Sequence, residues 1–134
     1  MKSVFDIKES LMFDAVVFEQ MKRSASSLLA GTKDNKYTQV IVLLTEAGGE
    51  YGKVVVNALS EDKAEEKALL ERLSEAKDTV VTRVLCMWQD GGIDLPSMKF
   101  RKLLCELDPK NSESGIFVIT ADGFSVIKTE NTMK

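Results

Sequence analysis

Two kinds of apolar pattern alternate along this chain, and their order constrains the fold more than any single residue does. Segments with apolar residues at helical spacing are separated by short apolar, β-branched runs that are typical of buried strands. The predicted helices span residues 7–30, 60–77 and 96–107, and the predicted strands span 38–45, 51–57, 79–88, 116–120 and 124–128. This order, α-β-β-α-β-α-β-β, predicts an α/β fold with helices packed on the faces of one mixed sheet.

The chain is long enough to form a core of its own. It has 134 residues, of which 44% are hydrophobic and 29% are charged, and a chain of this length buries a substantial core without disulfide bonds. No internal linker, repeat or low-complexity stretch divides it. We therefore expect one domain over residues 1–134.

The ends of the predicted helices have recognisable signals. Gly31 is a suitable stop for the first helix, and Ser60, followed by acidic residues, is a suitable N-cap for the second. The polar tail after Thr129 is expected to fray. In the first helix, Phe13, Val16 and Val17 widen the apolar stripe beyond one core face, which predicts a homo-oligomer contact unless the helix is fully enclosed.

Charge and hydropathy exclude some partners. Eighteen basic and twenty-one acidic residues give a formal net charge of −3, which argues against bulk electrostatic binding to nucleic acid or to an anionic membrane. The first residues become acidic at Asp6 before a signal-type apolar core can form, and no apolar segment reaches membrane-spanning length. We expect a cytoplasmic protein.

The chain has no histidine and two cysteines. Histidine-dependent nucleophile systems and every zinc site that uses imidazole are therefore excluded. Cys86 and Cys105 supply at most two soft ligands, one fewer than a catalytic zinc normally takes from protein. Both lie in apolar runs, where we expect buried free thiols.

Two local segments, in this element order, resemble the cytidine deaminase family. The first is Pro96-Ser97-Met98-Lys99-Phe100-Arg101, which runs parallel to the family's Pro-Cys-Gly-x-Cys-Arg helix start. The second is Lys63-Ala64-Glu65, which stands where the family has Cys-Ala-Glu. The likeness spans roughly residues 11–128, and it implies a three-layer α-β-α sandwich.

The resemblance also implies where a zinc site would lie. In such enzymes a zinc ion is held at the N-termini of two neighbouring helices, and a glutamate moves protons between the zinc-bound water and the base. The ligand positions here hold Lys63, Ser97 and Phe100, none of which is a zinc ligand, while the proton-shuttle position holds Glu65. We therefore expect no metal and no other cofactor, and no zinc-dependent deamination.

The sugar-binding positions implied by the resemblance are changed as well. They fall on Val54 and Val56, whose hydrocarbon side chains cannot hydrogen-bond to ribose hydroxyls. Together with Val55 these valines are typical of a strand buried on both faces.

Two functional interpretations remain open. In the first, the protein is non-enzymatic: it binds a small anionic or nucleotide-like ligand through Lys63, Ser97 and Lys99 near two helix N-termini, or it acts as an oligomeric structural protein. A simpler interpretation of the same residues is two solvated lysines and a helix cap.

The alternative is an active enzyme of hydrolase or deaminase type that uses Glu65 with a metal other than zinc, or with none. Asp62, Asp90 and Asp94 are further candidate oxygen ligands for such a metal. Trp88, at the end of a predicted strand, is either a core residue or a stacking surface for a planar ligand.

Overall fold

The computed structural model describes residues 4–32 and 37–133, and within the first helix it describes side chains from Phe13 onwards. The described elements are the helices α1 (Val4–Ala30), α2 (Ala64–Glu75) and α3 (Met98–Leu107), the strands β1 (Gln39–Thr45), β2 (Glu50–Val55), β3 (Val81–Trp88), β4 (Ile93–Asp94), β5 (Gly115–Thr120) and β6 (Gly123–Lys128), and the short 3-10 helices η1 (Pro109–Glu113) and η2 (Thr129–Thr132). The predicted order of helices and long strands is confirmed. The two-residue strand β4 and both 3-10 helices were not predicted.

All the described strands belong to one sheet. Its order is β2-β1-β3-β5-β6, and β4 pairs separately with β3. Neighbouring strands are antiparallel except β3 and β5, which pair in parallel through Arg83 with Gly115 and Val84 with Ile116. The connection between these two parallel strands includes α3. The predicted mixed sheet is confirmed.

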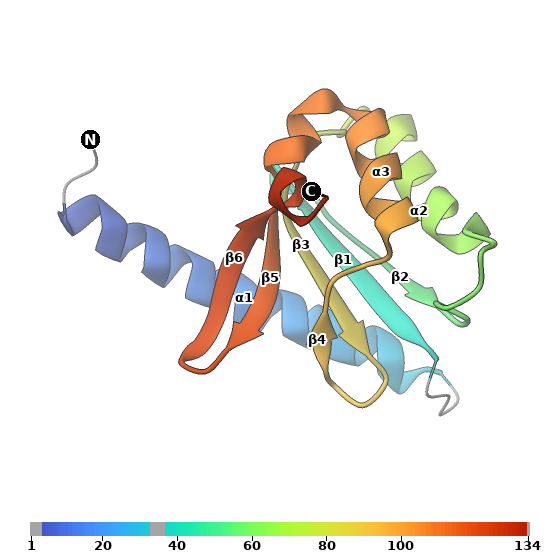
Figure 1. The fold of residues 1–134 in the computed structure, drawn as a ribbon, viewed down its shortest axis with the longest axis horizontal. Coiled ribbons are helices and arrows are strands. Elements are labelled where there is room, and N and C mark those ends of the chain that lie inside the picture. Colours follow the sequence, from blue (N-terminus) through green and yellow to red (C-terminus); the bar gives the residue numbers. More distant parts are fainter. Residues whose placement is uncertain (1–3, 33–36, 134) are drawn as a thin grey trace.

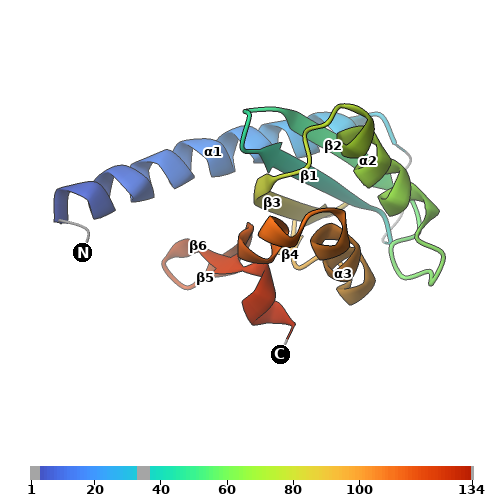
Figure 2. The ribbon, with the colours of Figure 1, turned by 90° about the horizontal axis from the view of Figure 1, so that it is seen from above.

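Helices cover both faces of this sheet (Figures 1 and 2). On β1, Val40 and Val42 pack into the apolar cluster that α1 covers, whereas Ile41 and Leu43 pack into the cluster under α2 and α3. Successive side chains of a strand point to opposite faces, so an unbroken apolar run such as 40–43 supplies both cores. The result is the expected three-layer α-β-α sandwich.

The helix α1 is the longest element, with 27 residues. It crosses β1, β2 and β3 on one face of the sheet, and its N-terminal part extends beyond the sheet (Figure 1). None of the described helices combines the length and the apolar character needed to span a bilayer.

The prediction that Ser60 caps the second helix is wrong. The helix α2 begins at Ala64 with Lys63 as its N-cap, and the hydroxyl of Ser60 accepts a hydrogen bond from the backbone N–H of Asp62 in the preceding turn. The reason is a side-chain contact within the preceding loop, because the Lys63 ammonium donates to the backbone carbonyl of Ala58, five residues earlier, and so holds residues 58–63 in a loop. Only at Lys67 does a backbone N–H reach back to Lys63 and start the helical pattern.

The prediction that the valines around Val55 are buried on both faces is also wrong. The strand β2 lies at one edge of the sheet and ends at Val55. Val54 is only partly buried, and Val56, beyond the end of the strand, is 51% exposed. An edge strand has neighbours on one side only, which the composition of the run does not reveal.

The chain after Thr129 does not fray as predicted, at least to Met133. Thr129 is fully buried, and its N–H and hydroxyl both donate to the carbonyl of Ser114. Arg101 binds the same segment from α3, because its Nη1 donates to the carbonyl of Thr132 at 2.8 Å. Long-range bonds of this kind are invisible in a local polar composition.

Candidate functional site

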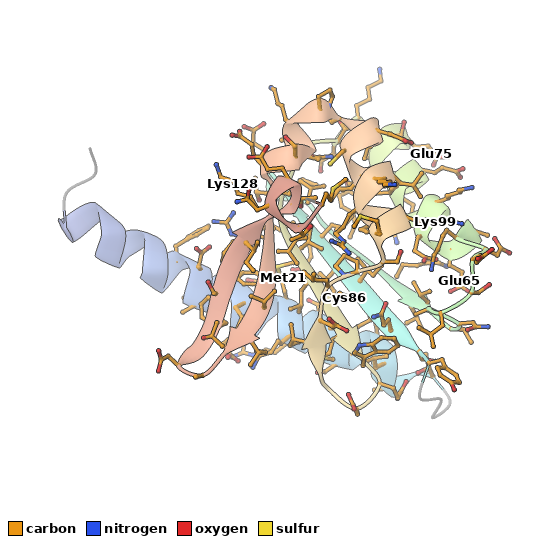
Figure 3. All side chains as sticks on the ribbon, in the orientation of Figure 1. Met21, Glu65, Glu75, Cys86, Lys99 and Lys128 are labelled. Atoms are coloured by element: carbon orange, nitrogen blue, oxygen red, sulfur yellow. The ribbon has the colours of Figure 1, made fainter. Side chains whose placement is uncertain are left out.

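The starts of α2 and α3 lie side by side on one face of the sheet, at the same end of both helices (Figure 1). A contact between the two starts is made by Lys99, whose Nζ lies 3.4 Å from the backbone carbonyl of Glu61 (Figure 3). The structure therefore brings together the two segments that the sequence comparison singled out, Lys63 to Glu65 and Ser97 to Lys99.

Lys63 is buried at the start of α2, so its interpretation as a solvated lysine is wrong. Its side chain is 7% exposed, and its Nζ lies 2.9 Å from the carbonyl of Ala58 and 3.3 Å from Oε2 of Glu66, which is 3% exposed. A buried ammonium needs such a counter-charge, because desolvation strongly disfavours an isolated ion. An ammonium at this position repels a metal cation rather than binding it.

The other two positions expected from the family also have internal roles. The hydroxyl of Ser97 caps α3 by accepting from the N–H of Phe100 at 3.1 Å, as the simpler interpretation of this residue predicts. Phe100 is completely buried in the cluster under α2 and α3. Within residues 4–32 and 37–133, no three acidic, histidine or cysteine side chains are grouped so that they could hold a metal ion.

Glu65 lies on the outer side of α2, at its start (Figure 3). Its Oε2 accepts a hydrogen bond from the backbone N–H of Val56 at 2.9 Å. It borders a small cavity of about 160 Å³ together with Asp62 and Glu66. The carboxylate of Glu65 therefore holds the end of β2 against α2.

Of the other candidate oxygen ligands, Asp62 borders the same small cavity as Glu65, whereas Asp90 and Asp94 do not. Asp90 and Asp94 lie in the β3–β4 hairpin, where Asp90 accepts from the N–H of Gly92 and Asp94 accepts from Nε1 of Trp88 at 3.1 Å. Trp88 is partly buried and packs against the cluster under α2 and α3. The Trp88 ring therefore packs as part of the core, and Asp90 and Asp94 make hydrogen bonds within the β3–β4 hairpin.

Both thiols are poor nucleophiles in this fold. Cys86 is completely buried, and burial raises the pKa of its thiol far above the ordinary value. Cys105 is only partly buried, unlike the buried thiol predicted from its apolar run. Partial burial, with smaller contributions from Glu106 and Glu130, still raises the pKa of its thiol. Because the thiolate is the reactive form, neither side chain is suited to covalent catalysis at neutral pH.

A cavity of about 270 Å³ lies between α2 and α3, and we call it the lysine groove. Four lysines line it: Lys63, which is the N-cap of α2, Lys67 on α2, and Lys99 and Lys102 on α3. The remaining lining residues are Glu61, Leu103 and Glu106. The ion pairs among the described side chains include none with Lys67, Lys99 or Lys102.

Lys63 and Lys99 of this groove were predicted as ligand-binding residues from the sequence, whereas Lys67 and Lys102 were missed. A signal was available, since Lys67 follows Lys63 by four residues and Lys102 follows Lys99 by three, which places each pair on one helix face. What the sequence could not show is that the two faces point into the same cavity.

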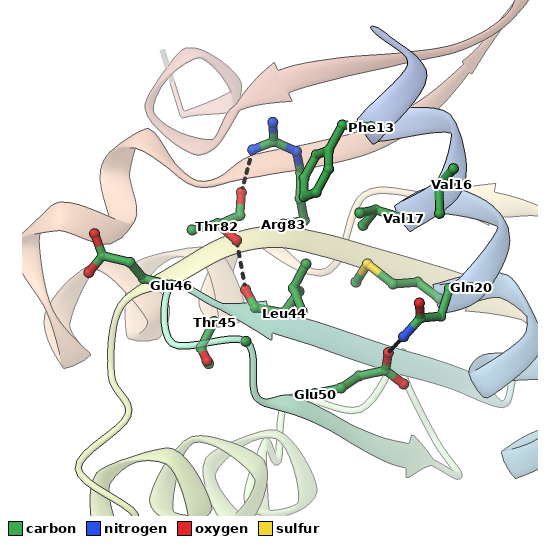
Figure 4. Close-up of a pocket in the computed structure, with 12 residues that line it drawn as sticks. Phe13, Val16, Val17, Gln20, Leu44, Thr45, Glu46, Glu50, Thr82 and Arg83 are labelled. Atoms are coloured by element: carbon green, nitrogen blue, oxygen red, sulfur yellow. Dashed lines mark hydrogen bonds between the residues drawn. The ribbon is translucent and has the colours of Figure 1, made fainter. Parts of the chain in front are cut away.

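A larger and mainly apolar cavity, of about 580 Å³, lies on the opposite face between α1 and the ends of β1 and β3 (Figure 4). Phe13 and Val16 border it and are 61% and 66% exposed, whereas Val17 is buried. Glu50 lies at its edge, where its carboxylate accepts from the Gln20 amide at 3.3 Å and from the Ser24 hydroxyl. The ionisable residues among those that line it are Glu46, Glu50 and Arg83.

Comparison with known proteins identifies the fold. No protein-family model matches the sequence, and no curated protein matches it by sequence similarity. Among solved structures, cytidine deaminase from Mycobacterium leprae matches with a TM-score of 0.64 and 15% identity, over 87% of this chain and 96% of that one. Cytidine deaminase from Bacillus anthracis matches with a TM-score of 0.63 and 16% identity, over 88% and 89%. The enzyme from Burkholderia pseudomallei matches with a TM-score of 0.62 and 12% identity, over 84% and 93%. The chain therefore has a cytidine-deaminase-like fold.

Proposed function

We propose that this protein is a catalytically degenerate, non-enzymatic member of the cytidine-deaminase-like fold that binds a small anionic ligand in the lysine groove. The observation that carries the proposal is the cluster of Lys67, Lys99 and Lys102 around one cavity, without an ion-pair partner among the described side chains. Like charges gathered in this way repel one another, and a bound anion relieves that repulsion.

The helix geometry adds to this attraction. Both α2 and α3 begin at the end of the groove formed by Lys63 and Lys99, and the positive ends of two helix dipoles favour negative charge there. The Lys99 ammonium makes only a long contact of 3.4 Å to the carbonyl of Glu61. It can turn from this weak partner to a phosphate or carboxylate at little energetic cost.

The same segments offer little for catalysis of deamination. The expected ligand positions hold an ammonium that is paired with Glu66, a hydroxyl that caps a helix, and the buried ring of Phe100. Glu65, in the proton-shuttle position, is engaged by the N–H of Val56. These contacts support a non-enzymatic role, with Lys63 as an internal ion-pair partner rather than a ligand contact.

The test is a titration with inorganic phosphate at low ionic strength, followed by calorimetry. We expect the Lys99→Gln/Lys102→Gln variant to bind phosphate at least about tenfold more weakly than the original chain, since two charge-assisted contacts are removed. The matched control is Lys110→Gln, which removes an exposed lysine on η1, outside the groove, and should bind like the original. Equal binding by all three proteins, or no binding by any, contradicts an anion site here.

The non-enzymatic part of the proposal has its own test. Elemental analysis of the purified protein should find no stoichiometric zinc, and cytidine and deoxycytidine should not be turned over. One zinc per chain would overturn the zinc-free proposal, and turnover that Glu65→Gln abolishes would establish the enzymatic alternative.

A further inference from the structure

We propose that the ligand of the lysine groove is a phosphate ester of a polyhydroxylated compound, such as a sugar phosphate, rather than a simple inorganic anion. This inference rests on the proposed anion site and names the class of compound that it binds. Its basis is that the groove contains two carboxylates and an apolar side chain beside its lysines.

The size of the groove argues against a lone phosphate. Its volume is about 270 Å³, room for roughly nine water molecules at about 30 Å³ each. This lies just below the range of about 300–1,000 Å³ that is typical of pockets for drug-sized ligands. A phosphate group fills only one end of such a space, and an organic moiety of several carbon atoms fills the remainder.

The chemistry of the groove changes along its length. At the helix starts lie Lys63 and Lys99, whereas Glu106 lies seven residues beyond Lys99 along α3, a rise of about 10 Å. Lys67 and Lys102 lie between these ends, one helical turn beyond the starts. A ligand that follows this groove meets Lys99 and Glu61 at one end, Lys67 and Lys102 in the middle, and Glu106 at the other end.

The carboxylate of Glu106 is free to act as a hydrogen-bond acceptor. It follows Lys102 by four residues, but the structure contains no ion pair between them, consistent with the less favourable order of a lysine before a glutamate on a helix. A carboxylate at neutral pH accepts hydrogen bonds but donates none. It therefore selects ligand groups that donate, such as hydroxyls, and repels a second phosphate.

Leu103 provides the third element of recognition. It is partly buried between Lys102 and the core, and it lines the groove on the turn between Lys99 and Glu106. Its side chain, with the methylene stems of the neighbouring lysines, offers an apolar surface for the C–H face of a sugar. Phosphate, carbon skeleton and hydroxyls thus each have a matching part of the groove.

The experiment compares inorganic phosphate, glucose 6-phosphate and glucose by calorimetry on the full chain. We expect glucose 6-phosphate to bind about tenfold more tightly than phosphate, because hydrogen bonds from hydroxyls to a charged acceptor are added, and glucose alone to bind too weakly to detect. The variant Glu106→Ala should lose this preference while binding phosphate as well as or better than the original chain. The control Glu75→Ala removes an exposed glutamate at the far end of α2 (Figure 3) and should keep the preference.

The outcomes separate the two proposals. Equal affinity for phosphate and glucose 6-phosphate, or a preference that survives in Glu106→Ala, overturns the sugar-phosphate inference and leaves the anion site intact. Failure of both phosphates to bind overturns the anion site itself. Circular dichroism of each variant verifies that the fold is retained.

Discussion

Replacing Lys63 by methionine would leave the Glu66 carboxylate in the protein interior without its counter-ion. The two side chains are 7% and 4% exposed, and Nζ lies 3.3 Å from Oε2. At an effective dielectric constant of about 20, the Coulomb attraction at this distance is about 5 kcal/mol. Removal of one member of such a buried pair typically destabilises a protein by about 3–5 kcal/mol, and we expect Lys63→Met to lower the free energy of unfolding by that amount.

Replacing both partners should have a much smaller effect. The double variant Lys63→Met/Glu66→Leu avoids burying two charges, so the desolvation penalty disappears together with the attraction. Such exchanges are often neutral, or stabilising by about 1–4 kcal/mol. Equilibrium urea unfolding at pH 7 of the original chain, both single variants and the double variant completes a double-mutant cycle, from which we expect a coupling energy above about 2 kcal/mol.

Glu19 and Lys22 on α1 provide a matched control. They have the same spacing of three residues and a similar separation of 3.1 Å, but their side chains are 58% and 36% exposed. The corresponding cycle with Lys22→Met and Glu19→Leu should give a coupling energy of about 0.5 kcal/mol or less. If the two cycles give equal coupling energies, or if Lys63→Met costs less than about 1 kcal/mol, then the Lys63 ammonium is not desolvated and the reasoning fails.

Two further predictions concern the other face of the sheet and the core. The exposed Phe13 and Val16 beside the apolar cavity of α1 predict that a second copy of the chain covers them. Light scattering should therefore show an oligomer that Val16→Glu dissociates, while the control Leu59→Glu, at another exposed apolar residue, leaves it intact. A monomeric original chain contradicts this prediction. The raised pKa of the buried Cys86 thiol predicts a stability that declines at alkaline pH. Above about pH 8.5 the unfolded chain releases the thiol proton while the folded chain retains it, so the free energy of unfolding falls by up to about 1.4 kcal/mol per pH unit. The stability difference between the original chain and Cys86→Ala, followed by urea unfolding from pH 7 to 10, should shrink accordingly, and a difference independent of pH would contradict the burial of the thiol.

Most of the fold was predictable because its signals are local. Helical spacing of apolar residues and β-branched runs located all three helices and five of the six strands. The missed strand, β4, has two residues, Ile93 and Asp94, and pairs with β3 through a hairpin that lacks a strand-like pattern. Ser97 was identified correctly as a helix cap because capping depends on residues close by in the chain.

The errors occurred where the structure depends on particular contacts or on strand order, which apolar spacing and residue composition do not reveal. The start of α2 moved from Ser60 to Ala64 because Lys63 binds the carbonyl of Ala58. Val54 is only partly buried because β2 is an edge strand, which depends on the order of the strands in the sheet, and Val56 is exposed because it lies beyond the end of that strand. Thr129 is buried because Ser114, fifteen residues away, accepts its hydrogen bonds.

The sequence by itself determined which side chains stand at the starts of two helices: a lysine, a serine and a phenylalanine at the positions that the family resemblance assigns to zinc ligands, with no histidine in the chain. Residue type and spacing are properties of the sequence itself, so no structure is needed to determine them. The tertiary structure alone decided that Lys63 turns inward to Glu66, and that Lys67 and Lys102 join Lys99 around one cavity with Glu106 at its end. Burial and convergence depend on the packing of α2 against α3, because charges on two helices act on one ligand only when both helices lie on the same face of the sheet.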